Sequence, residues 1–388
     1  MEQLHSAEPA EMLKELNGAQ PTVIGVEGGP CGGKTTLINS IVESAYLANR
    51  NVVVLDEVAT KHITKLTEQG IDFFDMLQNN RQAFLEVEVA ILGDIISTIE
   101  QAKQTYAGTN TIIIADRASI KAYVSAEEHN WILEQLGRVQ APHLDLVDTM
   151  VFLPSVAREN AELYEQLKAT NDARYEPASV AQAVCEANFD AIKDHPELHV
   201  FWGGTFTDKI REATEIITHP EREIEPKFMP TNTAAFESYL ESIVGTDDFI
   251  TTTYIEQSYH VVDDVEARLR KVTTLAGESV YFCSFKEPVS PTEKTERRHT
   301  ITEKEYELLT AAPSIGAVQK LRHSFFVTDP TTGKRLVWVA DEYQKETGRF
   351  WNIEVELPTA DMLENLYFPV RLQQVEYSAR DLAIAQAG

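Results

Sequence analysis

The chain has 388 residues, more than one hydrophobic core usually holds (about 250–300 residues), so its length indicates two domains. Its 34 basic and 61 acidic side chains give a formal net charge of −27. This charge excludes non-specific binding of nucleic acid, which depends on neutralising phosphates, and no DNA partner is expected. Hydrophobic residues make up 43% of the chain, which is typical of globular proteins.

The cysteines and the apolar stretches indicate a cytoplasmic protein. Cys31, Cys185 and Cys283 lack the spacing of a metal site and are an odd set for disulfides. The first 20 residues contain no apolar core of a signal peptide. No stretch reaches the roughly 18 apolar residues that span a bilayer, so no transmembrane segment is expected.

The first half alternates short apolar strands with helical stretches. Strands rich in Val and Ile are predicted at 22–27, 51–56, 111–116 and 149–153, and the clearest helices at 34–48 and 81–105. Such alternation is typical of βαβ units, so we expect an α/β domain with a parallel sheet.

The second half has a different pattern of residues. After a helix predicted at 207–218, the sequence turns to strand-like segments with alternating charges and turn signals such as residues 329–333. We therefore place the domain boundary near Pro220, with domains at 1–219 and 220–388.

Residues 28–35 fit the pattern G-x-x-x-x-G-K-[ST] between a predicted strand and a predicted helix. In such a loop, backbone N–H groups wrap phosphate oxygens. Lys34 is expected to reach the β- and γ-phosphates, and the Thr35 hydroxyl to bind Mg²⁺. The alternative is a chance glycine turn. The pattern predicts a site for ATP or GTP, with the nucleotide-binding residues Gly28, Gly33, Lys34, Thr35 and Thr36.

Acidic residues end two further strands at the edge where α/β sheets bind ligands. Asp116 is a candidate metal-side carboxylate, and Glu57 a candidate base for an acceptor hydroxyl, or merely a helix cap. Arg174 follows the fourth strand and is a candidate lid arginine that stabilises the transferring phosphoryl group, or a solvated charge. We expect Lys34, Glu57, Asp116 and Arg174 to carry any phosphoryl transfer.

These motifs resemble the small-molecule P-loop kinases of the deoxynucleoside and ribosylnicotinamide type. The resemblance covers about residues 20–215 and rests on 26–35, Asp56-Glu57 and Asp116-Arg117. It implies phosphoryl transfer from a nucleoside triphosphate to a small acceptor.

Charged residues recur at alternate positions along the strands predicted in the second half. Alternate residues of a strand project from one face, so each pair points its charges one way. Like charges on one face repel unless opposite charges lie between them. The charged positions are Glu223, Glu225 and Lys227, then Arg268 and Arg270, Lys286, Lys320 and Arg322, and finally Glu354 and Glu356.

Either of two arrangements fits these pairs. Solvated outer faces explain each pair alone. A closed sheet with a charged lumen explains all of them, because basic strands then hold phosphates and acidic strands hold a divalent cation. The second arrangement predicts a polyphosphate site.

The segment Glu223-Ile224-Glu225-Pro226-Lys227 resembles the ExExK signature of CYTH proteins, the triphosphate tunnel metalloenzymes. The resemblance implies an eight-stranded antiparallel barrel over about residues 221–360, in an α+β domain. In it, Glu223, Glu225, Glu354 and Glu356 would bind Mg²⁺ or Mn²⁺. The polyphosphate would be held by Lys227, Arg268, Arg270, Lys286, Lys320 and Arg322. Arg298, two residues after Glu296, stands where the family often has a second glutamate.

The order of the two parts is similar to that in the family that includes the TRPL translocation defect protein, a GTP- and lipid-binding regulator. Two functions follow. The tunnel binds and hydrolyses an inorganic or organic triphosphate with Mg²⁺ or Mn²⁺, or the protein is a nucleotide-dependent switch whose tunnel only binds an anion such as a lipid headgroup.

Overall fold

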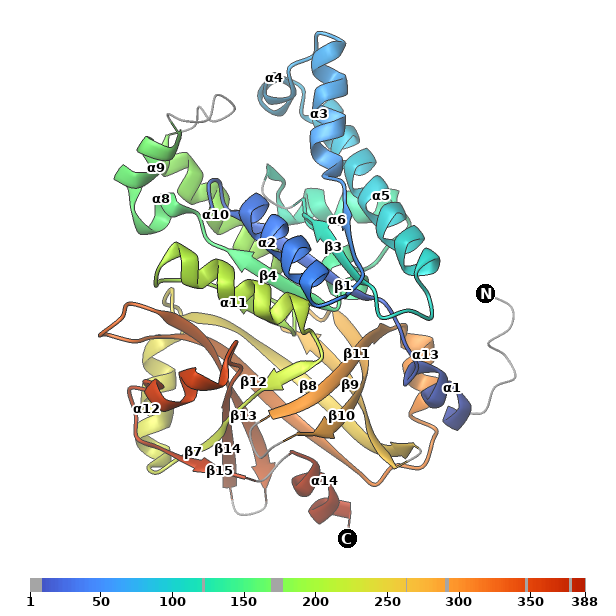
Figure 1. Ribbon diagram of the computed structural model, residues 1–388, viewed down its shortest axis with the longest axis vertical. Helices are drawn as coiled ribbons and strands as arrows, with labels where there is room; N and C mark the ends of the chain where they lie inside the picture. The colour runs from blue at the N-terminus through green and yellow to red at the C-terminus, as the bar shows by residue number, and fades with distance from the viewer. Residues whose placement is uncertain are drawn as a thin grey trace. The chain divides into compact units, whose positions relative to one another are not determined.

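The computed structural model describes residues 9–120, 123–168, 177–262, 264–289, 293–345, 348–376 and 379–387 (Figure 1). Its contacts divide the chain into two compact units, Pro21–His199 and Val200–Gly388 together with Met1–Gln20. Residues 200–219, assigned above to the first domain, therefore lie with the second unit. Whether fragments cut near Pro220 fold alone stays a prediction.

The unit Pro21–His199 is an α/β domain with a parallel sheet, as expected. Its strands are β1 (Thr22–Gly28), β2 (Val52–Leu55), β3 (Ile112–Asp116), β4 (Thr149–Leu153) and β5 (Leu198–Val200), in the order β2-β3-β1-β4-β5. The residues of β1, β3 and β4 are almost all buried, because helices cover both faces of the sheet. The four predicted strands are confirmed within two residues at each end.

The helices of this unit follow the predicted alternation. Those predicted at 34–48 and 81–105 are observed as α2 (Lys34–Leu47) and α5 (Arg81–Thr105). The others are α3 (Val58–Glu68), α4 (Phe73–Asn79), α6 (Ala126–Gln135), α7 (Pro142–Asp145), α8 (Val156–Glu159), α9 (Ala161–Lys168) and α10 (Ala178–Ile192).

The second unit is built on a separate antiparallel sheet. Its strands are β6 (Arg222–Ile224), β7 (Lys227–Pro230), β8 (Phe249–Val262), β9 (Val265–Thr274), β10 (Ser279–Pro288), β11 (Glu293–Ile301), β12 (Gly316–Thr328), β13 (Arg335–Lys345), β14 (Gly348–Val355) and β15 (Leu372–Val375). They are ordered β15-β7-β14-β13-β12-β8-β9-β10-β11-β6. The predicted turn at 329–333 joins β12 to β13.

Two strands that are consecutive in the chain lie near opposite ends of this order. β6 pairs with β11, β7 pairs with β14, and only Glu225 and Pro226 separate β6 from β7. The N–H of Leu357, just after β14, also donates to the carbonyl of Ile224 in β6 at 2.8 Å. The two ends of the sheet are thus connected both covalently and by a hydrogen bond.

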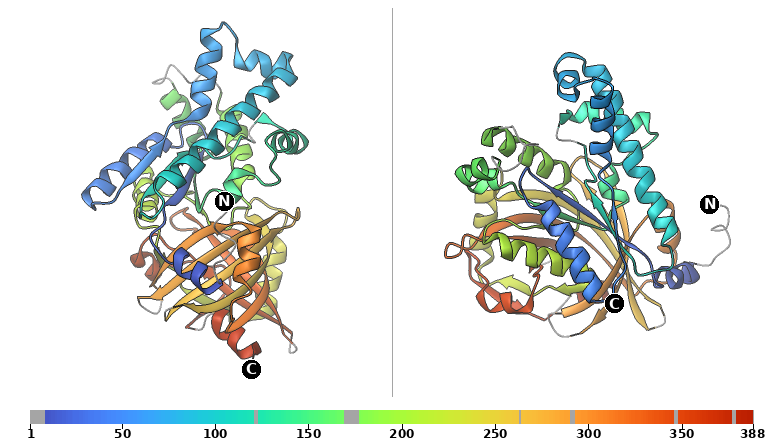
Figure 2. Two further views of the ribbon diagram at one scale, coloured as in Figure 1. Left: turned by 90° about the vertical axis from the view of Figure 1, so that its right-hand side faces the viewer. Right: turned by 45° about the horizontal axis from the view of Figure 1, so that its top comes forward.

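The helices of this unit are α1 (Pro9–Leu16), α11 (Phe206–Thr218), α12 (Thr233–Ile243), α13 (Glu303–Leu309) and α14 (Ala379–Ala387), with a 3₁₀ turn, η2 (Ala360–Asn365). α1, α12 and α13 pack on the outer face of the sheet. α14 packs instead on Tyr259, Val318 and Tyr343 of the inner face. α1 lies against this sheet (Figure 2). Its Met12 and Leu13 belong to a core with Ala267 and Leu269 of β9. A second core joins Phe236 of α12 to the outer residues of β12–β14. The alternate residues of these strands are left to face inward.

Among the described residues, no helix has the length and apolar character needed to cross a membrane.

Candidate functional site

The loop after β1 has the backbone that a phosphate-binding loop requires. A Cβ on Gly28 would lie 2.4 Å from the carbonyl oxygen of Leu153, and one on Gly32 would lie 2.6 Å from the same atom. Gly33 has a φ of 96°, which only glycine adopts without strain, and helix α2 begins at the next residue, Lys34. The glycines are therefore needed for shape, and the helix N-terminus faces the loop.

The carboxyl ends of β1, β2 and β3 bring three predicted residues, Lys34, Glu57 and Asp116, close enough for their charges to interact. Burial raises the pKa of Asp116; Lys34 lowers it and Glu57 raises it. One oxygen of Asp116 is buried and has no hydrogen-bond partner in the part of the chain that the structure describes. A buried acceptor without a partner, beside the P-loop lysine, fits a bound cation. The residues therefore fit Mg²⁺ with a nucleoside triphosphate.

The remaining predictions for this unit have mixed outcomes. Glu57 is the N-cap residue of α3, yet its side chain caps no backbone N–H and instead accepts from the Thr60 hydroxyl at 2.8 Å. This geometry does not support the capping alternative. Thr35 and Thr36 lie exposed in the first turn of α2. Arg174 lies outside the described residues.

Three charged residues near this site were not among the predicted site residues, although Glu27 and Arg117 belong to the motifs quoted above. Glu27 is buried and accepts from the N–H groups of Ala118 and Ser119 at 2.9 and 3.0 Å. Arg117 has a positive φ of 75°, a rare conformation for a side chain of its size. Burial raises the pKa of Glu88 to about 7, against the opposing effect of Arg117 and Arg81. Glu88 belongs to none of the sequence motifs. Only the fold brings it close enough to Arg117 for their charges to interact.

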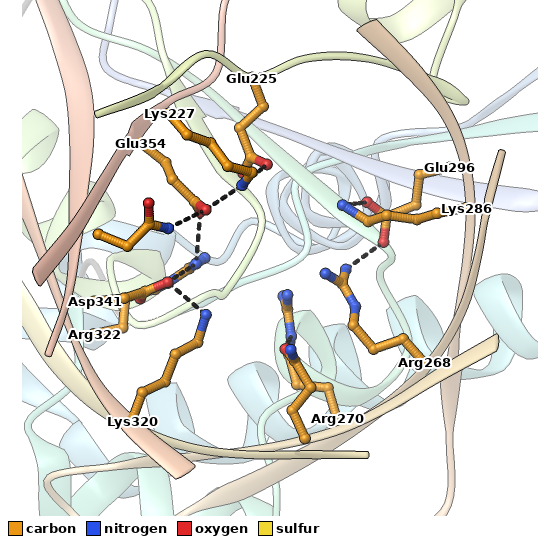
Figure 3. Close-up of polar contacts among 12 residues, drawn as sticks. Glu225, Lys227, Arg268, Arg270, Lys286, Glu296, Lys320, Arg322, Asp341 and Glu354 are labelled. Carbon is orange, nitrogen blue, oxygen red and sulfur yellow. Dashed lines mark hydrogen bonds and ion pairs between the residues drawn. The ribbon is translucent and has the colours of Figure 1, made fainter. Parts of the chain in front are cut away.

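The antiparallel sheet encloses a charged cavity of about 530 Å³. All six predicted phosphate ligands line it: Lys227, Arg268, Arg270, Lys286, Lys320 and Arg322. Figure 3 shows them pointing towards a common space from different sides. Neutral and apolar neighbours of these residues, such as Ala267 and Leu269, belong to the outer core. The predicted alternation of charged inward and apolar outward residues thus holds in β9.

On one side of the cavity, Asp341 binds two of these cations. Lys320 donates to it at 2.5 Å, and Arg322 donates through Nε and Nη2 at 2.7 and 2.8 Å. Arg322 and Asp341 are directly paired across β12 and β13. Burial lowers the pKa of Lys320 to about 7; Asp341 opposes this shift, while Arg322 and Arg270 add to it. The ammonium of Lys320 therefore titrates near neutral pH.

On another side, Glu296 is surrounded by cations. Arg268, Lys286 and Arg298 lie 2.5, 2.9 and 3.0 Å from its oxygens. The three cations hold the pKa of Glu296 well below its ordinary value, although burial alone would raise it. Arg298, the departure from the family pattern, is thus a counterion of this glutamate.

The predicted metal ligands are only partly brought together. Glu225 and Glu354 line the cavity, whereas Glu356 is not among the lining residues. Glu223 lies in β6, opposite Lys294 of β11. Lys227 pairs with Glu225 at 2.7 Å and also with Glu354. The described residues contain no group of three or more His, Cys, Asp or Glu that could hold a metal ion. The described side chains, which do not include that of Glu223, therefore do not form a metal site from protein ligands alone.

Asp341 is the principal residue of the cavity that was missed. It follows an alternating run in β13, but nothing in its local sequence distinguishes an inward Asp341 from its outward neighbour Glu342. Its role depends on pairing with β12, which the sequence does not specify.

Comparison with known proteins places a family domain in the first unit. Residues 23–197 match the sequence model of a family described as an AAA domain, which is P-loop-like. No curated protein matches the chain.

Solved structures provide distant similarities. The inorganic triphosphatase NE1496 is 20% identical, with 42% of this chain and 94% of that chain covered and a TM-score of 0.27. A putative adenylyl cyclase from Hippeastrum, HpAC1, described as having a dominant triphosphatase activity, is 14% identical over 42% and 96%, with a TM-score of 0.33. PH1012 from Pyrococcus horikoshii is 19% identical over 37% and 84%, with a TM-score of 0.27.

Proposed function

We propose that this protein binds a nucleoside triphosphate with Mg²⁺ at its P-loop and a triphosphate or related polyphosphate in the cavity of its antiparallel sheet. The observation that carries the second part is the convergence of six basic side chains, from β7, β9, β10 and β12, on one cavity. Among the described residues that line it, eight are basic and five acidic, although the chain as a whole is strongly acidic. Such a local reversal of charge favours a polyanion.

The arrangement of these cations favours an extended phosphate chain over a single anion. Lys320 and Arg322 gather around Asp341, while Arg268 and Lys286 gather around Glu296 on the other side, as Figure 3 shows. We expect linked phosphates to contact both clusters at once. The cavity volume of about 530 Å³ also lies within the range of about 300–1,000 Å³ that is usual for small-ligand sites.

We further propose that the sheet is a closed eight-stranded barrel of the CYTH type. β6 and β7 then form one interrupted strand, pairing on one side with β11 and on the other with β14. With β8 to β14 this gives eight strands, and β15 is an addition beside β7. Closure explains why charged side chains are buried on the inner face.

In the P-loop unit, we propose the roles that the kinase resemblance implies. Lys34 would contact the β- and γ-phosphates, and Thr35 and Asp116 would hold Mg²⁺, which neutralises charge on the transferring group. Glu57 would accept the proton of an acceptor hydroxyl. Arg174 would close over the phosphates. We also place the protein in the cytoplasm, because no disulfide joins its three cysteines.

Hydrolysis of the bound triphosphate is the second candidate function. It is favoured by Glu225 and Glu354, which lie beside the basic residues of the cavity. Mg²⁺ is usually bound by one or two carboxylates together with substrate phosphates, so a metal carried by the ligand would find such partners here. Phosphate release with Mg²⁺ or Mn²⁺ separates a hydrolase from a binding protein.

Calorimetry of the full chain with inorganic tripolyphosphate tests polyphosphate binding. Because the P-loop also attracts phosphates, the Lys34→Ala chain is titrated in parallel. Arg270→Ala should weaken the binding that remains by about tenfold or more, because a charge-assisted hydrogen bond contributes about 1.5–3 kcal/mol. Lys271→Met is the matched control, since Lys271 is adjacent in β9 and pairs with Glu256 at 3.7 Å outside the cavity. Equal affinities of both variants and the parent, with and without Mg²⁺, would refute the site.

A further inference from the structure

The ammonium of Lys227 lies between two carboxylates of the cavity. It donates to Glu225 at 2.7 Å and also to Glu354. All three side chains are at most 16% exposed. The positive charge between the two candidate metal ligands is thus supplied by the protein itself (Figure 3).

Glu354 also accepts hydrogen bonds from two further side chains. Glu354 accepts from Arg322 Nη2 at 3.1 Å and from the amide of Asn352 at 2.6 Å. Glu296 and Asp341, the other buried carboxylates of the lumen, are held by lysines and arginines as described above. A divalent cation would have to displace these cations, each of which would then be buried without its partner.

The geometry points to a polyphosphate site that needs no divalent cation for binding, in which the Lys227 ammonium takes the place of the metal between Glu225 and Glu354. This inference rests on the proposed function of the cavity. It concerns binding alone and leaves open whether hydrolysis, a separate step, uses Mg²⁺.

The charges of the cavity support binding of the metal-free ligand. Arg270 donates through Nε to a neutral partner, Gln257, at 3.2 Å, and Arg268 donates through Nε to the Ser284 hydroxyl at 3.2 Å. These neutral acceptors orient both guanidiniums, and Arg268 also pairs with Glu296. A free polyphosphate carries more negative charge than its magnesium complex, so a cavity rich in such cations attracts the free form more strongly.

A site whose resident cation is Lys227 and a site that binds a metal predict opposite effects of Glu225→Gln. The substitution keeps the shape of the side chain and removes one negative charge. If Glu225 holds a metal, metal-dependent affinity is lost. If Lys227 is the resident cation, the variant removes one of the two negative charges that neutralise its ammonium. The affinity for the metal-free ligand then stays equal or rises.

Calorimetry of the full chain carrying Lys34→Ala, titrated with inorganic tripolyphosphate in EDTA and then in Mg²⁺, tests the inference. We expect binding in EDTA to be at least as tight as in Mg²⁺, and Glu225→Gln to keep or increase the affinity in EDTA. Lys227→Met should lower the affinity in EDTA by tenfold or more. Glu225→Gln keeps the test decisive if Lys227→Met does not fold.

Two results would contradict the inference in different ways. Binding seen only with Mg²⁺ and lost in Glu225→Gln would overturn metal independence while the proposed polyphosphate site stands. No binding that depends on Arg270 in either buffer would remove the proposed function itself, and the inference with it.

Discussion

The guanidinium carbon of Arg335 lies 4.5 Å from the ring centre of Trp202, and the two residues also form an isolated β-bridge. The Arg335 N–H donates to the Trp202 carbonyl at 2.9 Å. A second ring, Phe326, lies 4.3 Å from the same guanidinium. The two rings also contact each other edge to face, with their centres 5.6 Å apart. This three-residue cluster fixes the segment that begins at residue 200 on the antiparallel sheet.

The cluster of Trp202, Phe326 and Arg335 predicts where the chain can be cut. A fragment of residues 200–388 should be more stable than one of 219–388, because the shorter fragment loses Trp202 and helix α11. It also leaves Lys334 without Glu212, its partner at 2.6 Å in a partly buried ion pair. Urea unfolding of both fragments, followed by circular dichroism, measures the difference.

Both fragments lack α1, so their comparison isolates residues 200–218. Equal unfolding free energies of the two fragments would place the domain boundary near Pro220. If neither fragment folds, the second unit depends on α1, whose Met12 and Leu13 belong to its core.

Nucleotide binding should depend on Lys34. Lys34→Ala removes the ammonium expected at the β- and γ-phosphates and should weaken binding of Mg·ATP or Mg·GTP at least tenfold. Fluorescent nucleotide titration measures this loss. Lys193→Ala is the control, because Lys193 is a surface residue that pairs with Asp190. Unchanged affinity in Lys34→Ala would show that the loop does not work as a P-loop.

Polyphosphate affinity should fall as the pH rises through 7. The pKa of Lys320 is lowered to about 7, mainly by burial, so the free cavity loses this charge above neutral pH. A bound anion favours the ammonium, and binding at pH 8 should therefore take up a proton. The affinity should fall by about tenfold from pH 6 to pH 8.5, which corresponds to a loss of about 1.4 kcal/mol.

Calorimetry in buffers of different ionisation enthalpy detects that proton. Lys320→Arg keeps its charge at both pH values and should abolish the proton uptake. Equal proton uptake by the parent and by Lys320→Arg would assign the effect to another group.

The stability of the P-loop unit should fall with rising pH because of Glu88. Its pKa is raised from 4.5 to about 7 by burial, so the folded state holds a proton that the unfolded state has lost between these values. Stability from this group is complete below pH 4.5 and declines as the pH rises towards 7 and beyond. Glu88→Gln should therefore stabilise the protein at pH 8, by about 3 kcal/mol.

Chemical unfolding at pH 5 and pH 8 measures this effect. Glu86→Gln, an exposed position on the same helix, is the control and should change little at either pH. A Glu88→Gln chain that is destabilised equally at both values would show that the carboxylate is charged and well stabilised in the folded state.

The local pattern of the sequence determined the helices and strands and indicated that the protein binds phosphates. Alternating apolar strands and helices specified the α/β unit, since each element carries its own periodicity. The glycines and lysine of residues 28–35 specified the loop, because their conformation is local. Charges at alternate positions of one strand, such as Arg268 and Arg270, specified a charged face on the same grounds.

Only the tertiary structure decided which charges meet. Lys227 binds Glu354 across 127 residues, Asp341 faces Arg322 through strand register, and Glu296 is shared by Arg268, Lys286 and Arg298. The same tertiary contacts assign Trp202 to the second unit. A strand's sequence fixes which side chains share a face, but the partner of each charge depends on how distant strands align, and their alignment is set by packing of the whole sheet.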